Sequence, residues 1–313
     1  MNRHAIAIII PAYNESLTIA GVVETFHRAL PDAALFVIDN RSTDGTGTLA
    51  KETFIRLGCT GEVLYETRPG KGYAVSRAFQ DIQADIYVLV DGDATYHAAD
   101  LADLLKPVTE GVADMVIGDR ISEGQYQGTN ARRFHQFGNA LVKWLINFLF
   151  EAQLQDILTG YRVFNRKFVK SFPSTSRGFE IETEMTLHAL DQDFRIVSIP
   201  VQYRDRPLGS ESKLRTISDG ILVLRTIMSI FKDYRPLLFF SALSLIAFLT
   251  GLAIGFPVIS EFLATRYITK IPSAILASGV IIIAVMLLAV GLILDSVVKI
   301  NRRNFRLWLL REE

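Results

Sequence analysis

The sequence predicts an α/β domain with a mostly parallel sheet, followed by an amphipathic helix and a two-helix transmembrane hairpin. Strand and helix patterns alternate over the first two thirds of the chain, which predicts the α/β domain. Two later stretches, 237–260 and 271–294, contain no charged residue. A helix needs roughly 20 apolar residues to cross a bilayer core, so each stretch is long enough to span it.

The strands of the predicted sheet are short segments rich in β-branched and aromatic residues. They cover 5–10, 34–38, 62–66, 86–90, 114–118 and 194–201. Apolar residues at helical spacing predict helices over 17–30, from the turn at 39–46 toward Arg56, over 72–79, up to Pro107 and up to Phe150. In open sheets of this kind, ligands bind where the strands end at their carboxyl side, so the loops after the strands are the expected site.

We expect the chain to divide into a domain over 1–215, an amphipathic helix over 216–236, the hairpin over 237–294 and a basic tail over 295–313. The apolar face of the amphipathic helix is formed by Ile217, Ile221, Leu224, Met228 and Phe231. This helix can lie in the membrane interface or pack against the domain. A linker that docks the domain on the membrane satisfies both alternatives.

Basic residues near the hairpin indicate its orientation. They precede it at Arg225, Lys232 and Arg235 and follow it at Lys299, Arg302, Arg303, Arg306 and Arg311. The link over 261–270 carries only Arg266 and Lys270. By the positive-inside rule, the domain and both ends of the chain are cytoplasmic, in a protein that we expect in a bacterial inner membrane.

Composition excludes some classes of protein. The chain has 33 basic and 33 acidic residues, so no bulk charge favours a nucleic acid as partner. Its one cysteine, Cys59, rules out an internal disulfide and fits a reducing compartment. The apolar run over 5–10 is too short for a signal peptide and is interpreted as the first strand.

The strongest candidate site is Asp91-Gly92-Asp93, directly after the predicted strand 86–90. Two hard oxygen ligands separated by one glycine suit Mg²⁺ or Mn²⁺ that bridges a diphosphate. On its own, such a triplet is more often a solvated turn. Its interpretation as a metal site therefore depends on the residues around it.

Basic residues follow several other predicted strands. Lys71 lies between two glycines at a helix start, where exposed amides favour anions, although an ordinary turn is the alternative. Arg120 follows the strand 114–118 and can pair with a phosphate or form a surface salt bridge. Arg132 and Arg133 precede an apolar helix, as a phosphate clamp beside lipid or a helix-start charge cluster. The basic loop 203–214 is either a lid over a diphosphate or an exposed linker.

Taken together, these motifs resemble family 2 glycosyltransferases, in the branch that contains dolichyl-phosphate mannose synthase and bacterial polyprenyl-phosphate glycosyltransferases. The resemblance covers about residues 5–215. It is carried by Pro11-Ala-Tyr-Asn-Glu15, Asp39-Asn-x-Ser-x-Asp-Gly-Thr46, Gly70-Lys-Gly72, Asp91-Gly-Asp93, Gly118-Asp-Arg120, Thr159-Gly-Tyr-Arg162 and Gly209-Ser-x-Ser-Lys213.

The resemblance implies a GT-A fold, which is Rossmann-like, with a nucleotide-sugar donor and a lipid-phosphate acceptor. The donor would be held by Pro11, Tyr13, Glu15 and Asp39 at the nucleoside, by Lys71, Asp91 and Gly92 near the diphosphate, and by Arg206 and Lys213, which close over the phosphates. Asp91 and Asp93 would bind the metal, and Arg120, Arg133 and Asn139 the acceptor phosphate. The expected catalytic set is Asp91, Asp93, Arg120 and Arg133.

Three positions matter beyond these sets. Glu184 matches a family glutamate after a glycine-aromatic pair. Thr95 occupies the place where many relatives have a glutamine near the metal, which leaves the third ligand open. His135 and Gln136 lie where relatives often have a serine beside the acceptor.

The function implied is the inverting, metal-dependent transfer of a hexose from a UDP- or GDP-sugar to undecaprenyl or dolichyl phosphate. A phosphate monoester is largely ionised at neutral pH, so no general base is required. The alternatives are extension of a cell-envelope glycan or glycolipid, transfer to a protein or soluble acceptor, and a non-catalytic membrane scaffold. Processive synthases usually carry a Gln-x-x-Arg-Trp motif, and this sequence has none. Relatives with such helical tails also suggest a homo-oligomer.

Overall fold

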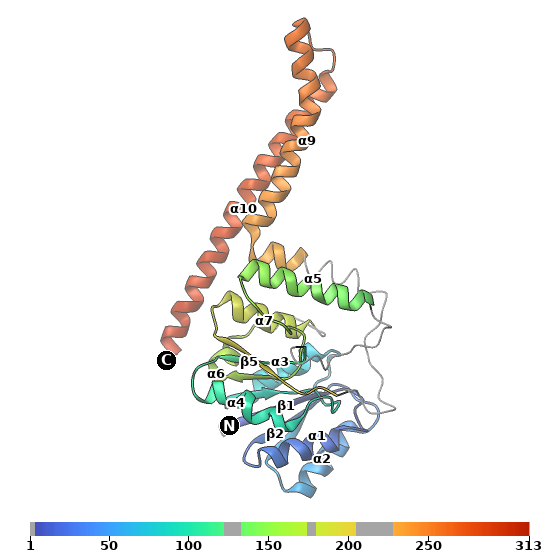
Figure 1. The fold of residues 1–313 in the computed structure, drawn as a ribbon, viewed down its shortest axis with the longest axis vertical. Coiled ribbons are helices and arrows are strands. Elements are labelled where there is room, and N and C mark those ends of the chain that lie inside the picture. Colours follow the sequence, from blue (N-terminus) through green and yellow to red (C-terminus); the bar gives the residue numbers. More distant parts are fainter. Residues whose placement is uncertain (1–3, 122–132, 174–179, 205–227, 313) are drawn as a thin grey trace. The chain divides into compact units, whose positions relative to one another are not determined.

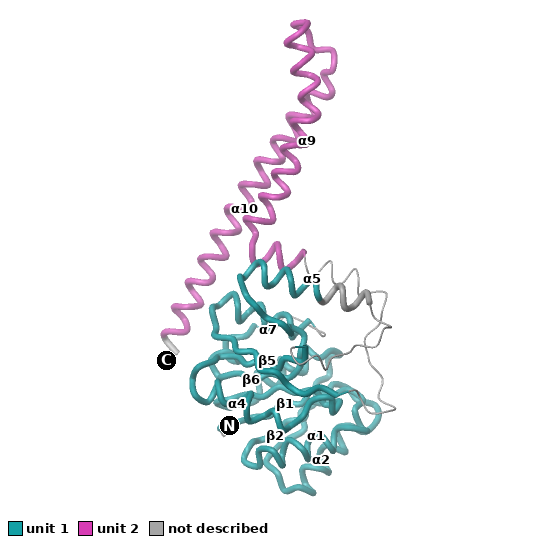
Figure 2. Tube along the Cα trace, viewed as in Figure 1, with its two compact units in different colours: residues 1–217 teal, residues 218–313 magenta. Residues whose placement is uncertain are grey.

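The structure is a computed structural model that describes residues 4–121, 133–173, 180–204 and 228–312. Within 133–139 only the backbone is described. The chain divides into two compact units, Met1–Ile217 and Ser218–Glu313 (Figure 2). Each unit is described by itself below.

The described part of unit 1 contains a seven-stranded sheet in the order β3-β2-β1-β4-β6-β5-β7. In Figure 1 the sheet lies between α1 on one side and α7 on the other. The strands are β1 (His4–Ala12), β2 (Ala34–Asp39), β3 (Gly61–Tyr65), β4 (Ala84–Leu89), β5 (Met115–Asp119), β6 (Arg162–Asn165) and β7 (Ile196–Pro200). Only β6 runs antiparallel to its neighbours, β4 and β5. The sheet is therefore mostly parallel, which confirms the predicted fold class.

β6 was not predicted from the sequence, because it is four residues long and begins at an arginine. A segment of this length shows no alternating pattern, and the charge at its first position argues against a buried strand. The register nevertheless pairs Arg162 with Leu89 of β4 and with Ile117 of β5. β6 thus brings the segment 156–161 to the ends of the two strands that carry the predicted carboxylates and Arg120.

Helices cover the sheet on both faces. They are α1 (Ile19–Ala29), α2 (Thr46–Leu57), α3 (Lys71–Asp81), α4 (Leu101–Thr109), α5 (Arg133–Phe150), α6 (Arg166–Ser171) and α7 (Ile181–Asp191), with a short 3-10 helix at Ala98–Asp100. On one face, α1 and α4 bury Val23, Phe26 and Leu104 against Ile8 and Val88 of the central strands. These large apolar side chains exclude water from the sheet, so the polar strand ends are the accessible edge.

The opposite face contains an aromatic cluster around His188 of α7. Phe168, Phe172 and Phe194 each lie with their ring centres 5.5–5.7 Å from the imidazole. The imidazole is 8% exposed, and burial lowers the pKa of His188 from 6.5 to about 4. His188 is therefore a neutral core residue at pH 7.

This burial predicts an acid-sensitive fold. Between pH 6.5 and pH 4 the unfolded chain binds a proton at His188 that the folded chain does not, so stability falls as the pH falls through this range, by about 3 kcal/mol at most. Thermal unfolding midpoints of the full chain in detergent at pH 7 and pH 5 measure the loss. A His188→Phe variant should lose less between the two pH values, and equal losses would contradict this assignment.

Unit 2 is a helical hairpin of α9 (Pro236–Thr265) and α10 (Ile271–Glu312), preceded by a helical segment over 228–234. Both helices are long and apolar enough to span a membrane, with mean hydropathies of 2.4 and 2.9 over their most apolar windows. Two contacts show that the helices pack closely. Gly251 leaves no room for a Cβ atom beside Ile281, and Ser244 Oγ donates to the Ala284 carbonyl at 2.7 Å. α10 continues without a break past residue 294, so the predicted basic tail is helical as far as Glu312.

Candidate active site

Asp91 and Asp93 lie just beyond β4, beside the carboxyl end of β1, which pairs with β4 in parallel. The Thr95 N–H and hydroxyl both donate to Asp93 Oδ1, at 3.2 and 2.6 Å. Thr95 and Asp93 are nearly buried, whereas the Asp91 side chain is 25% exposed. The residue at the place of the expected glutamine thus orients one carboxylate of the pair.

Asp91 rests directly on Gly160, which follows Thr159 in the loop before β6. A Cβ atom on Gly160 would overlap the Asp91 carboxylate, so only glycine allows this approach. The Gly160 N–H donates to Tyr96 Oη at 3.0 Å. The glycine of the Thr159-Gly-Tyr-Arg162 motif therefore lies in direct contact with the Asp91 carboxylate and leaves room for it.

Lys71, the first residue of α3, reaches two carboxylates. Its Nζ lies 2.5 Å from Asp91 Oδ1 and 2.5 Å from Glu182 Oε1. Burial alone lowers the pKa of Lys71, but the two carboxylates outweigh it, so the pKa lies above its usual value and the ammonium is charged. Burial raises the pKa of Glu182, and Lys71 only partly offsets that effect. The ammonium holds two acids together in a site that is largely shielded from water.

Arg120, beyond β5, is committed to Asp156. Its Nε and Nη2 donate to the two carboxylate oxygens at 2.7 and 3.0 Å, and its guanidinium lies over the Tyr203 ring. The side chains of Arg120 and Asp156 are only 16% and 2% exposed. Burial opposes ionisation of both groups, but Tyr96 and Asp156 together keep the pKa of Arg120 well above its usual value, and Arg120 keeps the pKa of Asp156 below its usual value. The salt bridge is buried rather than on the surface.

Arg162 is fully buried and holds the loop before β6. Its Nη2 donates to the Ile157 carbonyl at 2.7 Å and its Nε to the Thr159 carbonyl at 3.0 Å. Its Nη1 donates at 2.9 Å to Thr186 Oγ1, which itself donates to the Glu182 carbonyl. Burial lowers the pKa of Arg162 to about 10, so it stays charged at pH 7. Arg162 therefore links the loop 156–161, whose Gly160 contacts Asp91, to α7, which carries Glu182.

The predicted nucleoside residues lie at the carboxyl ends of β1 and β2. The Glu15 N–H donates to Thr46 Oγ1 at 2.9 Å, and the Ser42 N–H to Asp39 Oδ1 at 2.8 Å. Glu15 and Asp39 are nearly buried, whereas Tyr13 is 46% exposed. These polar residues therefore lie at the ends of β1 and β2, and β1 is the strand next to β4, which precedes Asp91.

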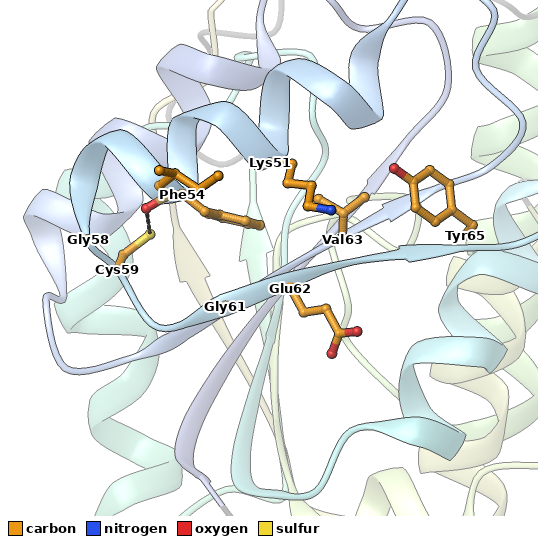
Figure 3. A pocket seen from close by; sticks show the side chains of 9 residues that line it. Lys51, Phe54, Gly58, Cys59, Gly61, Glu62, Val63 and Tyr65 are labelled. Atoms are coloured by element: carbon orange, nitrogen blue, oxygen red, sulfur yellow. Dashed lines mark hydrogen bonds between the residues drawn. The ribbon is translucent and has the colours of Figure 1, made fainter.

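A pocket of about 520 Å³ lies elsewhere, between α2 and the edge strand β3 (Figure 3). It is lined by Lys51, Phe54, Ile55, Gly58, Cys59, Gly61, Glu62, Val63 and Tyr65. None of these residues belongs to the predicted site. Burial raises the pKa of the Cys59 thiol, which makes it a weak nucleophile.

The profile of the family described as "Glycosyl transferase family 2" matches residues 7–172. The chain belongs to this family. Glycosyltransferase AglJ of Haloferax volcanii is 33% identical over 303 residues, which cover 96% of each chain. Polyprenol monophosphomannose synthase of Mycolicibacterium smegmatis is 30% identical over 212 residues, 64% of this chain and 78% of that protein.

Solved structures show the same fold. Glucosyl-3-phosphoglycerate synthase from Mycobacterium tuberculosis, crystallised with Mn²⁺, UDP and phosphoglyceric acid, matches with a TM-score of 0.56. It is 22% identical, and the match covers 73% of this chain and 78% of that one. The family 2 glycosyltransferase described here therefore has the GT-A fold.

Sequence reasoning missed Glu182 as a site residue. It singled out Glu184, which lies on the same helix but is only partly buried, whereas Glu182 is 3% exposed and contacts Lys71. Within the described residues, Glu182 Oε2 has no hydrogen-bond partner. A polar residue within an apolar helix was the available signal, but both glutamates gave it. Asp156, the partner of Arg120, was not singled out from the sequence either.

Several predicted residues cannot be placed. Arg206 and Lys213 lie outside the described residues. Arg133 and Asn139 lie on α5, where the structure describes the backbone alone. The sequence also suggested that the amides at the start of α3 bind an anion. One of them, the Gly70 N–H, already donates to Asn40 Oδ1 at 2.7 Å. The roles of all these residues stay predictions.

The two carboxylates fit a divalent metal. Mg²⁺ is typically held through one or two carboxylates together with substrate phosphate oxygens, and Mn²⁺ also prefers oxygen ligands. No cluster of three or more His, Cys, Asp or Glu side chains that could hold a metal occurs in the described ranges. Asp91 already contacts a cation, the Lys71 ammonium, so its oxygen faces a position that suits positive charge.

Proposed function

We propose that this family 2 glycosyltransferase transfers a hexose from a UDP- or GDP-sugar to polyprenyl phosphate, undecaprenyl or dolichyl, with inversion at the anomeric carbon. The observation that supports it best is the contact of the Lys71 ammonium with Asp91, just beyond β4, while Arg120 follows β5 at the carboxyl ends of the same sheet. Such a site suits two anions that must approach each other. The name of the mycobacterial relative supplies the class of acceptor.

The donor is proposed to bind across the ends of β1, β2 and β4. Pro11, Tyr13, Glu15 and Asp39 would contact the nucleoside, and Lys71 and Gly92 the diphosphate. Asp91 and Asp93 would hold Mg²⁺ or Mn²⁺, which offsets the charge that grows on the leaving diphosphate. The hydrogen bond from Thr95 would keep the Asp93 carboxylate in one orientation. The close contact with Gly160 would limit the positions that the Asp91 carboxylate can adopt.

The acceptor phosphate would attack without a base. One of its oxygens forms a bond to the anomeric carbon while the bond to the diphosphate oxygen breaks, and the electron pair leaves with the diphosphate. Because the second phosphate pKa is about 6, no proton has to be removed at neutral pH. Arg120, with Arg133 and Asn139 of α5, would hold this phosphate.

The membrane part of the proposal follows from unit 2. α9 and α10 would span the bilayer, with unit 1, residues 228–236 and the end of α10 on the cytoplasmic side. The boundaries near 215, 236 and 294 are proposed on the same basis. The hairpins would also pack into a homo-oligomer.

The choice of acceptor tests this chemistry. Purified protein should transfer sugar to undecaprenyl phosphate but not to undecaprenol, since the alcohol needs a base and lacks the charge that the arginines recognise. Organic-phase extraction of radiolabelled product measures both. Equal transfer to the alcohol would contradict the proposed acceptor, and label in a water-soluble glycan or protein would contradict lipid as the acceptor.

A further inference from the structure

A short segment after β7 contacts the loop that carries Asp93. The Arg204 N–H donates to the Thr95 carbonyl at 3.0 Å, and Arg204 Nε donates to the Ala94 carbonyl at 2.6 Å. Ala94 and Thr95 are the two residues that directly follow Asp93. Arg204 has no part in the mechanism described above, yet it holds this loop at two consecutive carbonyl groups.

Ala94 adopts a backbone conformation that alanine disfavours. Its φ is 60°, in the left-handed region, where the Cβ atom of an L-residue lies too close to a carbonyl oxygen. Glycine avoids this contact because it has no Cβ atom, and asparagine or aspartate can offset the strain through a local side-chain hydrogen bond. Alanine has neither property. The conformation of Ala94 therefore depends on contacts from neighbouring segments.

The conformation of Ala94 decides how Thr95 lies relative to Asp93. The Thr95 N–H and hydroxyl both donate to Asp93 Oδ1, at 3.2 and 2.6 Å. Because φ and ψ are the only soft torsions of the backbone, a change to negative φ at Ala94 would turn the Thr95 N–H away from this carboxylate. The orientation of the Asp93 carboxylate therefore depends on the left-handed conformation of Ala94.

The segment that carries Arg204 is itself anchored on unit 1. The Gln202 N–H donates to Asp100 Oδ2 at 2.9 Å, and Tyr203 pairs with Tyr96 in an isolated antiparallel bridge. The rings of these two tyrosines lie edge to face, with centres 5.4 Å apart. Arg204 therefore reaches the Ala94 carbonyl from a backbone that is held in place.

We propose that Arg204 is a positioning residue for the metal site: it holds Ala94 in the left-handed conformation and thereby keeps the Asp93 carboxylate oriented toward a divalent metal. The inference rests on the proposed function, in which Asp91 and Asp93 bind Mg²⁺ or Mn²⁺. The effect of Arg204 passes through the backbone of Ala94. A glycine at position 94, which adopts positive φ without strain, should therefore replace the arginine.

Mn²⁺ binding to the full-length protein in detergent tests the role of Arg204. Electron paramagnetic resonance measures free Mn²⁺ in the presence of UDP or GDP, whichever strengthens Mn²⁺ binding to the parent protein. Arg204→Met removes the guanidinium and keeps the backbone N–H that donates to Thr95. We expect Mn²⁺ affinity to fall about tenfold, at the low end for loss of a hydrogen bond from a charged group, because the contact is exposed.

Ala94→Gly supplies the comparison that a merely structural role would not predict. In the Arg204→Met background it should restore most of the lost Mn²⁺ affinity. Initial rates of transfer should agree: Arg204→Met needs more Mn²⁺ for its half-maximal rate, whereas kcat at saturating Mn²⁺ returns to the parent value. The matched control is Arg28→Met on α1, which removes an exposed positive charge from the same unit and should keep the parent affinity.

Three results would overturn the inference. Parent-like Mn²⁺ affinity in Arg204→Met means that the loop keeps its conformation without the arginine. Weakened affinity that Ala94→Gly does not restore means that the guanidinium acts by another route, such as contact with the nucleotide. A parent protein that binds no Mn²⁺ contradicts the metal role as well. Because binding needs no turnover, a protein that binds Mn²⁺ but transfers no sugar contradicts the proposed function and leaves this comparison intact.

Discussion

Asp93→Asn is expected to lower kcat/KM for sugar transfer by about a thousandfold, because a bound metal contributes several kcal/mol of charge stabilisation. Asparagine keeps an oxygen that can accept from Thr95, so the loop should stay folded. It removes one negative charge from the predicted metal site. The initial rate of transfer at several Mn²⁺ concentrations measures the effect, and the variant should require more Mn²⁺ for half-maximal rate.

The control is Asp103→Asn, which removes an exposed carboxylate from α4 on the same unit. It should keep the rate and the Mn²⁺ dependence of the parent. Near-normal turnover of Asp93→Asn with Mn²⁺ present would show that the metal role is wrong. Equal unfolding temperatures for the two variants ensure that the comparison concerns the site.

Arg162→Met is expected to destabilise the fold by about 2–6 kcal/mol and to abolish transfer. The substitution leaves the buried carbonyls of Ile157 and Thr159 without their donor, and each lost partner costs about 1–3 kcal/mol. It also removes the hydrogen bonds that hold the loop 156–161, which contains Asp156 and the Gly160 that contacts Asp91. Denaturant unfolding in detergent, with the rate of transfer, measures both effects.

Thr186→Val separates positioning from stability. It removes only the Arg162 contact that leads to the Glu182 carbonyl, and it keeps the shape of the side chain. We expect a loss of about 1–3 kcal/mol in stability. At a temperature where the variant is fully folded, kcat should fall more than KM changes. If kcat were unaffected in the folded variant, Arg162 would stabilise the fold without positioning the site.

The sequence predicted those parts of the fold that local patterns encode. Long apolar strands, the carboxylates at the end of β4 and the hairpin each occupy a continuous segment. The contacts that complete the site do not: Lys71 and Glu182 are 111 positions apart, and Arg120 and Asp156 are 36 apart. Hydrophobic periodicity gives no information about which distant charges meet.

The same limit explains why the sequence did not indicate Asp156 as the partner of Arg120 or Glu182 as a partner of Lys71. Arg120 was predicted as a phosphate ligand, and the structure shows that two of its nitrogen atoms already hold Asp156. Glu182 and Glu184 lie on one short helix, and only the packing of α7 against the site decides which one faces Lys71. Both outcomes depend on tertiary packing.

Transfer of label from a panel of radiolabelled UDP- and GDP-sugars tests the central claim most directly. Purified protein, undecaprenyl phosphate and Mn²⁺ are combined, and the organic phase is extracted with and without a chelator. We predict a lipid-extractable product from one donor that disappears when the metal is removed. A donor consumed without any lipid product, or a lipid product that forms unchanged with the chelator, would contradict the account.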